Sequence, residues 1–299
     1  MKQRILVITV LMGVLVSCND DAIFEKEMYK NEVALISSDY YNTFQEVIQL
    51  SNEEVVIGYI AASVGGTDAP TKELVIGLEE DTEPLALYNY SLYDADSALY
   101  AKPLPKAKYE IPDPKITVDA GERAGKTMIR LRPDGLSPDS TYFISLKATD
   151  ISGVELNPKK STILYQVVLE NEYASQAKNS LYTMTGMVDG MVTAANKELF
   201  PLSYNSVRLI AGNETFVSTE AAIKKSSIVL EVAEDNSVTI KPYGTIQVTQ
   251  LDDDDKYPNV FMVDDYYGQK TNVFLLSYEY TIGNVTKVMK ERVEMQVRN

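Results

Sequence analysis

Apolar and polar residues alternate along many short stretches of the chain, which is the pattern of half-buried β-strands. In one such stretch Tyr142, Ile144 and Leu146 share a face and Lys147 lies opposite, and the same alternation runs over residues 274–282. Further short β-favouring runs are predicted at residues 33–36, 44–50, 55–63, 73–78, 127–131, 162–169, 180–188, 206–211, 227–232, 237–241, 245–249, 260–263 and 285–297. Strands at this spacing predict an all-β protein built from sandwiches or barrels.

Two local signals interrupt the strand pattern. Residues 83–100 are rich in Leu and Ala, and the spacing of Leu85, Tyr88 and Leu92 predicts one or two helical turns. Residues 282–285 carry Gly-Asn at their centre, and both residue types tolerate the positive φ of a primed turn. A tight hairpin is therefore predicted at that point.

The chain of 299 residues is longer than one typical sandwich, and its strand pattern breaks near the middle. A strand is predicted to end near residue 170, and a polar segment of small residues follows over 174–179 before strands resume. We therefore predict two β domains, over residues 33–172 and 178–299.

The N-terminus is arranged like a bacterial lipoprotein signal. Two basic residues precede an apolar run over residues 5–16, which is shorter than the ~20 residues that a spanning helix needs. The sequence ending at Cys18, the single cysteine of the chain, resembles a lipobox, whose cysteine is acylated before the chain is cut in front of it. This resemblance implies a signal peptide over 1–17 and a flexible tether over 18–32, and the alternative is a soluble secreted protein with a chance cysteine.

Lipidation at Cys18 would anchor the protein to a membrane without a spanning helix, since each buried acyl CH₂ contributes ~0.8 kcal/mol. Acidic residues follow the cysteine over 19–21, an arrangement that resembles the surface-export signal of Bacteroidetes lipoproteins. A solvated tether explains the same acidic residues equally well. The predicted location is the outer membrane, with the protein lipid-anchored and exposed at the cell surface.

Composition excludes several classes of function. A net charge of −15 argues against nucleic-acid binding, which needs a basic surface. The chain has no histidine, which rules out a Ser-His-Asp triad and an HExxH zinc site. We therefore predict no metal and no cofactor, and the acidic run over 252–255 is interpreted as a solvated hairpin tip rather than a calcium site. Carboxylate catalysis stays open, because 43 acidic residues do not single out a pair.

Five short motifs between residues 87 and 168 resemble, in order, a domain of unknown function in Bacteroidetes surface lipoproteins. They are Tyr88-Asn89, Leu104-Pro105 with Tyr109, residues 116–121 ending in Ala-Gly, residues 136–142 reading LSPDSTY, and Ser152-Gly153 with Asn157. The resemblance covers about residues 30–170 and implies an immunoglobulin-like or fibronectin-III-like sandwich. Proteins with this domain are often encoded in polysaccharide-utilisation loci.

The C-terminal part resembles the small β domain that follows this module in some of these lipoproteins, as the stretch over 272–281 illustrates. This resemblance implies an antiparallel barrel, a lipocalin-like fold or a second sandwich. Together the two resemblances imply the handling of glycans at the cell surface. They assign no ligand residue.

Tyrosine is the aromatic residue to consider for sugar binding, because the chain has 20 tyrosines and no tryptophan. A predicted loop before residue 268 places two adjacent rings beside two acids, which suits a sugar platform. The candidate ligand residues are Tyr257, Asp264, Asp265, Tyr266 and Tyr267. The alternative is a hairpin in which one tyrosine ring packs against the fold and the other side chains are exposed without a binding role. A second tyrosine cluster, interpreted as mainly structural, comprises Tyr88, Tyr90, Tyr93 and Tyr100.

The leading hypothesis is a non-catalytic glycan-binding lipoprotein that captures oligosaccharide for a TonB-dependent transporter of the outer membrane. The main alternative is a structural or adhesive surface protein that binds a protein partner. A third hypothesis, an acid-pair glycosidase, needs a cleft with two carboxylates about 5–10 Å apart.

Overall fold

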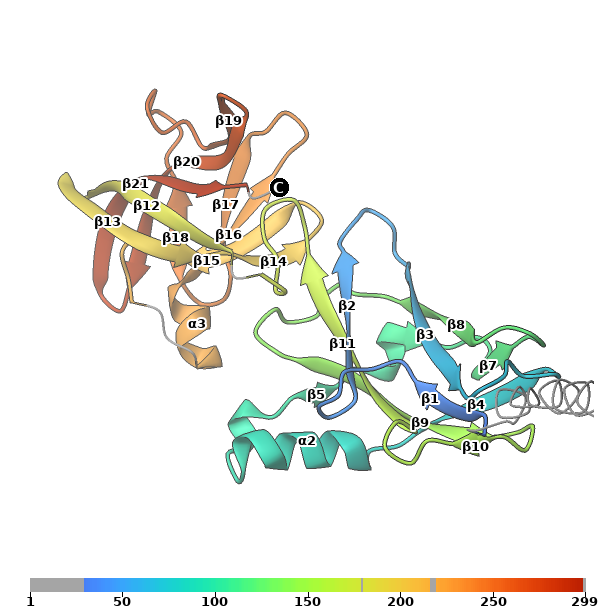
Figure 1. The fold of residues 1–299 in the computed structure, drawn as a ribbon. Coiled ribbons are helices and arrows are strands. Elements are labelled where there is room, and N and C mark those ends of the chain that lie inside the picture. The colour runs from blue at the N-terminus through green and yellow to red at the C-terminus, as the bar shows by residue number, and fades with distance from the viewer. Residues whose placement is uncertain (1–29, 179, 216–218, 298–299) are drawn as a thin grey trace, which may run out of the picture.

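The computed structural model describes residues 30–178, 180–215 and 219–297 (Figure 1). The all-β prediction is confirmed, because most of the regular secondary structure of the described residues is strand, arranged in four sheets. The predicted signal peptide over 1–17, the lipidation site Cys18 and the tether as far as residue 29 lie outside the described residues. Within the described ranges, no helix is both long enough and apolar enough to cross a membrane.

The N-terminal part is a sandwich of two sheets, which we call sheets A and B. Sheet A has the strand order β10 (Glu155–Leu156), β1 (Glu32–Leu35), β3 (Val56–Gly65), β8 (Ala124–Leu131) and β6 (Tyr109–Glu110). Sheet B has the order β2 (Thr43–Gln49), β11 (Thr162–Glu170), β9 (Tyr142–Asp150), β4 (Leu74–Glu80) and β7 (Lys115–Val118). The short β5 (Lys102–Pro103) pairs with β9 in parallel. Within sheet B, β2 pairs in parallel with β11, which lies about 120 positions further along the chain.

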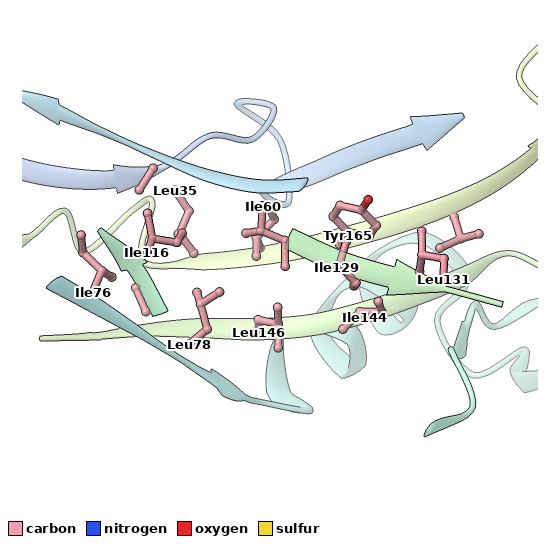
Figure 2. Packing of buried hydrophobic residues seen from close by; sticks show 14 of the residues in the cluster. Leu35, Ile60, Ile76, Leu78, Ile116, Ile129, Leu131, Ile144, Leu146 and Tyr165 are labelled. Atoms are coloured by element: carbon pink, nitrogen blue, oxygen red, sulfur yellow. The ribbon is translucent and has the colours of Figure 1, made fainter. Parts of the chain in front are cut away.

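Alternation along each strand produces the core between sheets A and B. In β7 the exposed Lys115 and Thr117 alternate with fully buried Ile116 and Val118, as the period of two requires. Figure 2 shows side chains from both sheets meeting between the layers. The labelled residues are Leu35, Ile60, Ile76, Leu78, Ile116, Ile129, Leu131, Ile144, Leu146 and Tyr165.

A helix covers part of the outer face of sheet B. The predicted helical turns over 83–100 become α2 (Glu83–Tyr93) and the 3₁₀ turn η2 (Ser97–Leu99). Leu85 of α2 packs with Phe143 and with Leu164, Ala101 and Tyr88 in a small cluster on this face. The Asn89 amide fixes the helix to the following segment, because its Oδ1 accepts from the Ala101 amide at 2.8 Å and its Nδ2 donates to the Ala101 carbonyl at 2.9 Å.

The C-terminal part also has two sheets, which we call sheets C and D. Sheet C has the order β13 (Met191–Glu198), β12 (Leu181–Val188), β21 (Val285–Gln296), β20 (Gln269–Ile282) and β18 (Gln247–Gln250), with β19 (Val260–Tyr266) paired to β20. Sheet D has the order β14 (Phe200–Ser203), β15 (Ser206–Ile210), β16 (Ser227–Val232) and β17 (Val238–Pro242), and α3 (Glu220–Ser226) precedes β16. The predicted tight hairpin joins β20 to β21, where Gly283 takes φ 64°.

The segment over 136–142 forms a turn immediately before β9. Gly135 takes φ 71° at its entry, which an L-residue rarely adopts. The Tyr142 hydroxyl accepts a hydrogen bond from the Ser137 amide at 3.4 Å, so the first residue of the strand holds the turn in place. Pro138 and Asp139 are thereby presented at the end of the sandwich that faces the C-terminal part.

Candidate functional site

An ion pair joins the two parts of the chain. Arg208 of β15 is fully buried, and its Nη2 lies 2.5 Å from Oδ1 of Asp139 in the turn before β9. The guanidinium also lies over the Phe200 ring at 4.2 Å and over the Tyr243 ring at 5.2 Å. The ion pair fixes the Asp139 turn against sheet D. Gln176, in the segment after β11, holds the same turn by donating to the Pro138 carbonyl at 2.6 Å.

Burial of this ion pair is electrostatically unfavourable. Burial raises the pKa of the Asp139 carboxyl, and the attraction of Arg208 only partly offsets this rise. Burial likewise lowers the pKa of the Arg208 guanidinium, again with a partial offset from Asp139. The two pKa shifts show that the desolvation penalty of each ion exceeds its attraction to the other ion, as is usual for buried ion pairs. The pair orients the two parts more than it stabilises them.

A cleft of about 190 Å³ opens beside this ion pair, between sheet B and the first strands of the C-terminal part. Figure 1 shows β2 and β11 side by side, with the end of β11 directed toward the C-terminal part. Eight of the thirteen residues that line the cleft are polar. The lining residues are Gln45, Pro138, Asp139, Ser140, Thr141, Gln166, Val167, Val168, Ser175, Gln176, Glu198, Leu199 and Phe200.

The sheet B wall of the cleft carries two amides side by side. Gln45 of β2 and Gln166 of β11 are register partners in the parallel pair, so both side chains stand on the outer face of sheet B. Gln166 is also opposite Phe143 of β9. Within the described parts of the chain, neither glutamine side chain has a hydrogen-bond partner. Two amide groups are therefore free to donate to and accept from a ligand.

The opposite wall carries a carboxylate and an aromatic ring. Alternation along β13 turns Lys197 into the interior of the C-terminal part and leaves the next residue, Glu198, at the cleft. Among the described residues the Glu198 carboxylate makes no hydrogen bond or ion pair, although it lies close enough to Arg208 to influence its pKa. Half-buried Phe200 supplies an apolar surface. Amides, hydroxyls, a carboxylate and one ring together suit a polyhydroxylated ligand.

The structure brings four of the five sequence-predicted ligand residues together. Asp264, Asp265, Tyr266 and Tyr267 lie at the turn between β19 and β20, where the two tyrosine rings are 4.6 Å apart, edge to face. The rings are 74% and 92% exposed. Tyr257 is separate, because it is buried and the seven-residue β19 places roughly 20 Å of extended chain between it and this turn.

Both acids at this turn already have partners. Asp264 Oδ2 lies 2.7 Å from Nη2 of Arg292, and Asp265 Oδ1 accepts from the Gly268 amide at 2.9 Å. They shape the hairpin, and the two tyrosine rings are the groups left accessible. The hairpin offers an exposed aromatic platform without a surrounding cavity.

The second predicted tyrosine cluster divides into three environments. Tyr88 is half-buried and packs edge to face on Phe143, with ring centroids 5.0 Å apart. Tyr93 and Tyr100 face each other at 6.5 Å. Tyr90 is 64% exposed on α2, and no ring contact involves it within the described residues.

Sequence reasoning missed the cleft as a site. Its lining comes from β2, the turn before β9, β11, the segment after β11 and the β13–β14 region, and no local pattern connects these segments. The nearest signal in the sequence is the motif over 136–142, which includes four of the lining residues. Sequence reasoning also missed Tyr40 and Tyr41, although they carry the same signal as Tyr266 and Tyr267, namely adjacent tyrosines followed by a residue that tolerates positive φ.

Family models match both parts of the chain. One described as an N-terminal domain matches residues 24–155, and another described as a C-terminal domain matches residues 161–294. No match is found among curated proteins.

Several solved structures from Bacteroides share this two-part fold. A Bacteroides ovatus protein of unknown function is 15% identical with a TM-score of 0.61, and the match covers 90% of this chain and 94% of that one. A Bacteroides ovatus multidomain protein that includes DUF1735 is 15% identical with a TM-score of 0.61, covering 89% and 94%. A Bacteroides thetaiotaomicron protein described as an auxiliary nutrient binding protein is 13% identical with a TM-score of 0.59, covering 87% and 94%. At these identities the likeness is one of fold.

Proposed function

We propose that this protein is a non-catalytic glycan-binding lipoprotein of the bacterial cell surface. It is anchored through Cys18, holds a short stretch of oligosaccharide in the cleft between its two parts, and passes it to a TonB-dependent transporter of the outer membrane. The ligand is a neutral glycan, because the chain carries a net charge of −15 and the cleft itself presents Glu198.

The observation that carries this proposal is the pair of free amides in the cleft. Gln45 and Gln166 stand side by side on the outer face of sheet B without partners among the described residues. An amide presents two donors and an acceptor, so two adjacent amides match neighbouring sugar hydroxyls. The Phe200 ring across the cleft gives the apolar face of a sugar a surface to pack on.

Two further observations support the proposal. The fold is shared with a Bacteroides protein described as an auxiliary nutrient binding protein. Of the two carboxylates that line the cleft, Asp139 is committed to its ion pair with Arg208, so the cleft does not offer the two free carboxylates that a glycosidase uses. The geometry therefore favours holding a glycan over cleaving it.

The Gln45→Ala/Gln166→Ala variant tests the cleft. We expect at least tenfold weaker glycan binding, since each lost hydrogen bond costs about 1 kcal/mol. The melting temperature should hardly change, because these amides bond to nothing in the described fold. Binding is measured by calorimetry with the best ligand from an array of plant, fungal and host glycans.

Gln247→Ala is the matched control, because Gln247 is an exposed strand glutamine of β18 that does not line the cleft. It should bind like the parent protein. Equal affinity of the double variant and the parent would contradict the cleft assignment. Absence of binding to every glycan by the folded parent, or shortening of the bound oligosaccharide, would contradict the proposed function itself.

A further inference from the structure

A line of aromatic rings runs from solvent to the buried contact between α2 and the outer face of sheet B. Tyr40 contacts Tyr41 with ring centroids 5.3 Å apart, and Tyr41 contacts Tyr88 at 5.3 Å. Tyr88 then contacts Phe143 at 5.0 Å. All three contacts are edge to face, the favoured geometry for aromatic pairs.

The inner end of this aromatic line lies next to a residue of the cleft. Phe143 of β9 is the register partner of Gln166 of β11, so their Cβ atoms are neighbours, roughly 5 Å apart, on the same face. Gln166 is one of the two free amides of the cleft. Phe143 itself is only 1% exposed beneath α2, so the accessible part of the line is Tyr40 with the partly exposed Tyr41 and Tyr88, and three ring contacts link Tyr40 to the neighbour of Gln166.

The outer end of the line is held in an unfavourable backbone conformation. Tyr41 and Asn42 both lie in the left-handed region, at φ 55° and 51°, which is rare for a residue as bulky as tyrosine. The Asn42 amide secures this turn by donating to the Lys159 carbonyl at 2.9 Å and to Thr162 Oγ1 at 3.0 Å. The turn leaves Tyr40 77% exposed, so the fold gains little from burying that ring. Backbone strain that presents an exposed ring points to a binding role.

We propose that the aromatic line is the outer part of the same binding site and that the ligand is a neutral oligosaccharide longer than a disaccharide. This inference rests on the proposed function. One end of the glycan hydrogen-bonds to Gln45 and Gln166 in the cleft, and a sugar ring further along stacks on Tyr40. The three steps between Tyr40 and Phe143 are each close to one sugar unit in length, so we expect a longer oligosaccharide, and not a disaccharide held in the cleft, to reach Tyr40.

The test compares ligands of two lengths against the Tyr40→Ala variant. The probes are the disaccharide and the hexasaccharide of β-1,4-glucan, β-1,4-xylan, β-1,4-mannan and α-1,6-mannan, with affinities measured by calorimetry. For the linkage that binds, we expect the parent to prefer the hexasaccharide. Tyr40→Ala should weaken hexasaccharide binding about three- to tenfold, the usual worth of one aromatic contact, and leave the disaccharide unaffected.

Tyr90→Ala is the matched control, because Tyr90 is also an exposed tyrosine beside this face but takes no part in the aromatic line. It should leave both affinities unchanged. Equal hexasaccharide affinity of the parent and Tyr40→Ala would overturn this inference and leave the proposed function standing. A loss seen only in Tyr266→Ala/Tyr267→Ala would also overturn it, by moving the site to the β19–β20 hairpin. Binding of none of the probes by the folded parent would overturn the proposed function and this inference together.

Discussion

The Lys197→Met substitution is expected to destabilise the C-terminal part by about 3–5 kcal/mol. Lys197 and Glu291 form an ion pair inside this part, with Nζ 2.5 Å from Oε2 and side chains only 4% and 0% exposed. Methionine keeps the side-chain length but leaves the carboxylate buried without a counter-ion. The Glu291 carboxylate would keep one partner, the Tyr278 hydroxyl, which donates to Oε1 at 2.7 Å. Differential scanning calorimetry measures the loss as a downward shift of the C-terminal transition.

A second substitution separates charge from packing. In the double variant Lys197→Met/Glu291→Gln both charges are gone, and the glutamine still accepts from Tyr278. We expect the double variant to recover most of the lost stability, because the cost of the single change is the stranded charge. Similar melting temperatures for the single and double variants would assign the loss to packing instead.

The Asp139→Ala substitution is expected to cost about 2–4 kcal/mol, because it leaves the fully buried Arg208 guanidinium without its anion. Ser227 Oγ, at 3.5 Å, is a weak substitute partner. Arg208→Met alone should cost much less, since the Asp139 side chain keeps 25% exposure to water and methionine can still pack on Phe200. The two single variants of this ion pair are thus expected to lose very different amounts of unfolding free energy.

A double-mutant cycle checks this asymmetry. In the presence of Arg208→Met, Asp139→Ala should have almost no further effect on the unfolding free energy, because no buried charge is left to strand. Additive costs from the two substitutions would mean that Asp139 and Arg208 are not energetically coupled, and would contradict the stranded-charge explanation. Since Asp139 lines the cleft, glycan affinity measured on the same variants also reports how far this junction shapes the site.

Local sequence patterns predicted the strands because burial on one face of a sheet repeats every two residues. The alternation at Tyr142, Ile144 and Leu146 became β9, and the alternation over 274–282 became β20. Gly283 takes positive φ in the hairpin turn that its residue type indicated. The helical segment over 83–100 was foreseen, but α2 runs for 11 residues because Leu85 and Tyr88 gain contacts with Phe143 that the local spacing does not reveal.

The spatial grouping of the five predicted ligand residues could not be predicted from their closeness in the sequence. Tyr266 and Tyr267 lie together because they are neighbours at a two-residue turn, whereas Tyr257 is carried to the far end of β19. Nearness along the chain implies nearness in space only within a turn or along one helix, since an extended strand separates residues by about 3.4 Å each. The grouping of the five residues was therefore decided by the length of one strand.

The sequence by itself determined the all-β class, the positions of most strands and the turns that require glycine, because these depend on interactions between residues a few positions apart. Only the tertiary structure decided that β2 lies beside β11, that Gln45 stands next to Gln166, and that Asp139 meets Arg208. These contacts join segments about 70 to 120 positions apart. They follow from how whole sheets bury their apolar faces against each other, and the alternation that marks a strand does not specify which strand will be its neighbour.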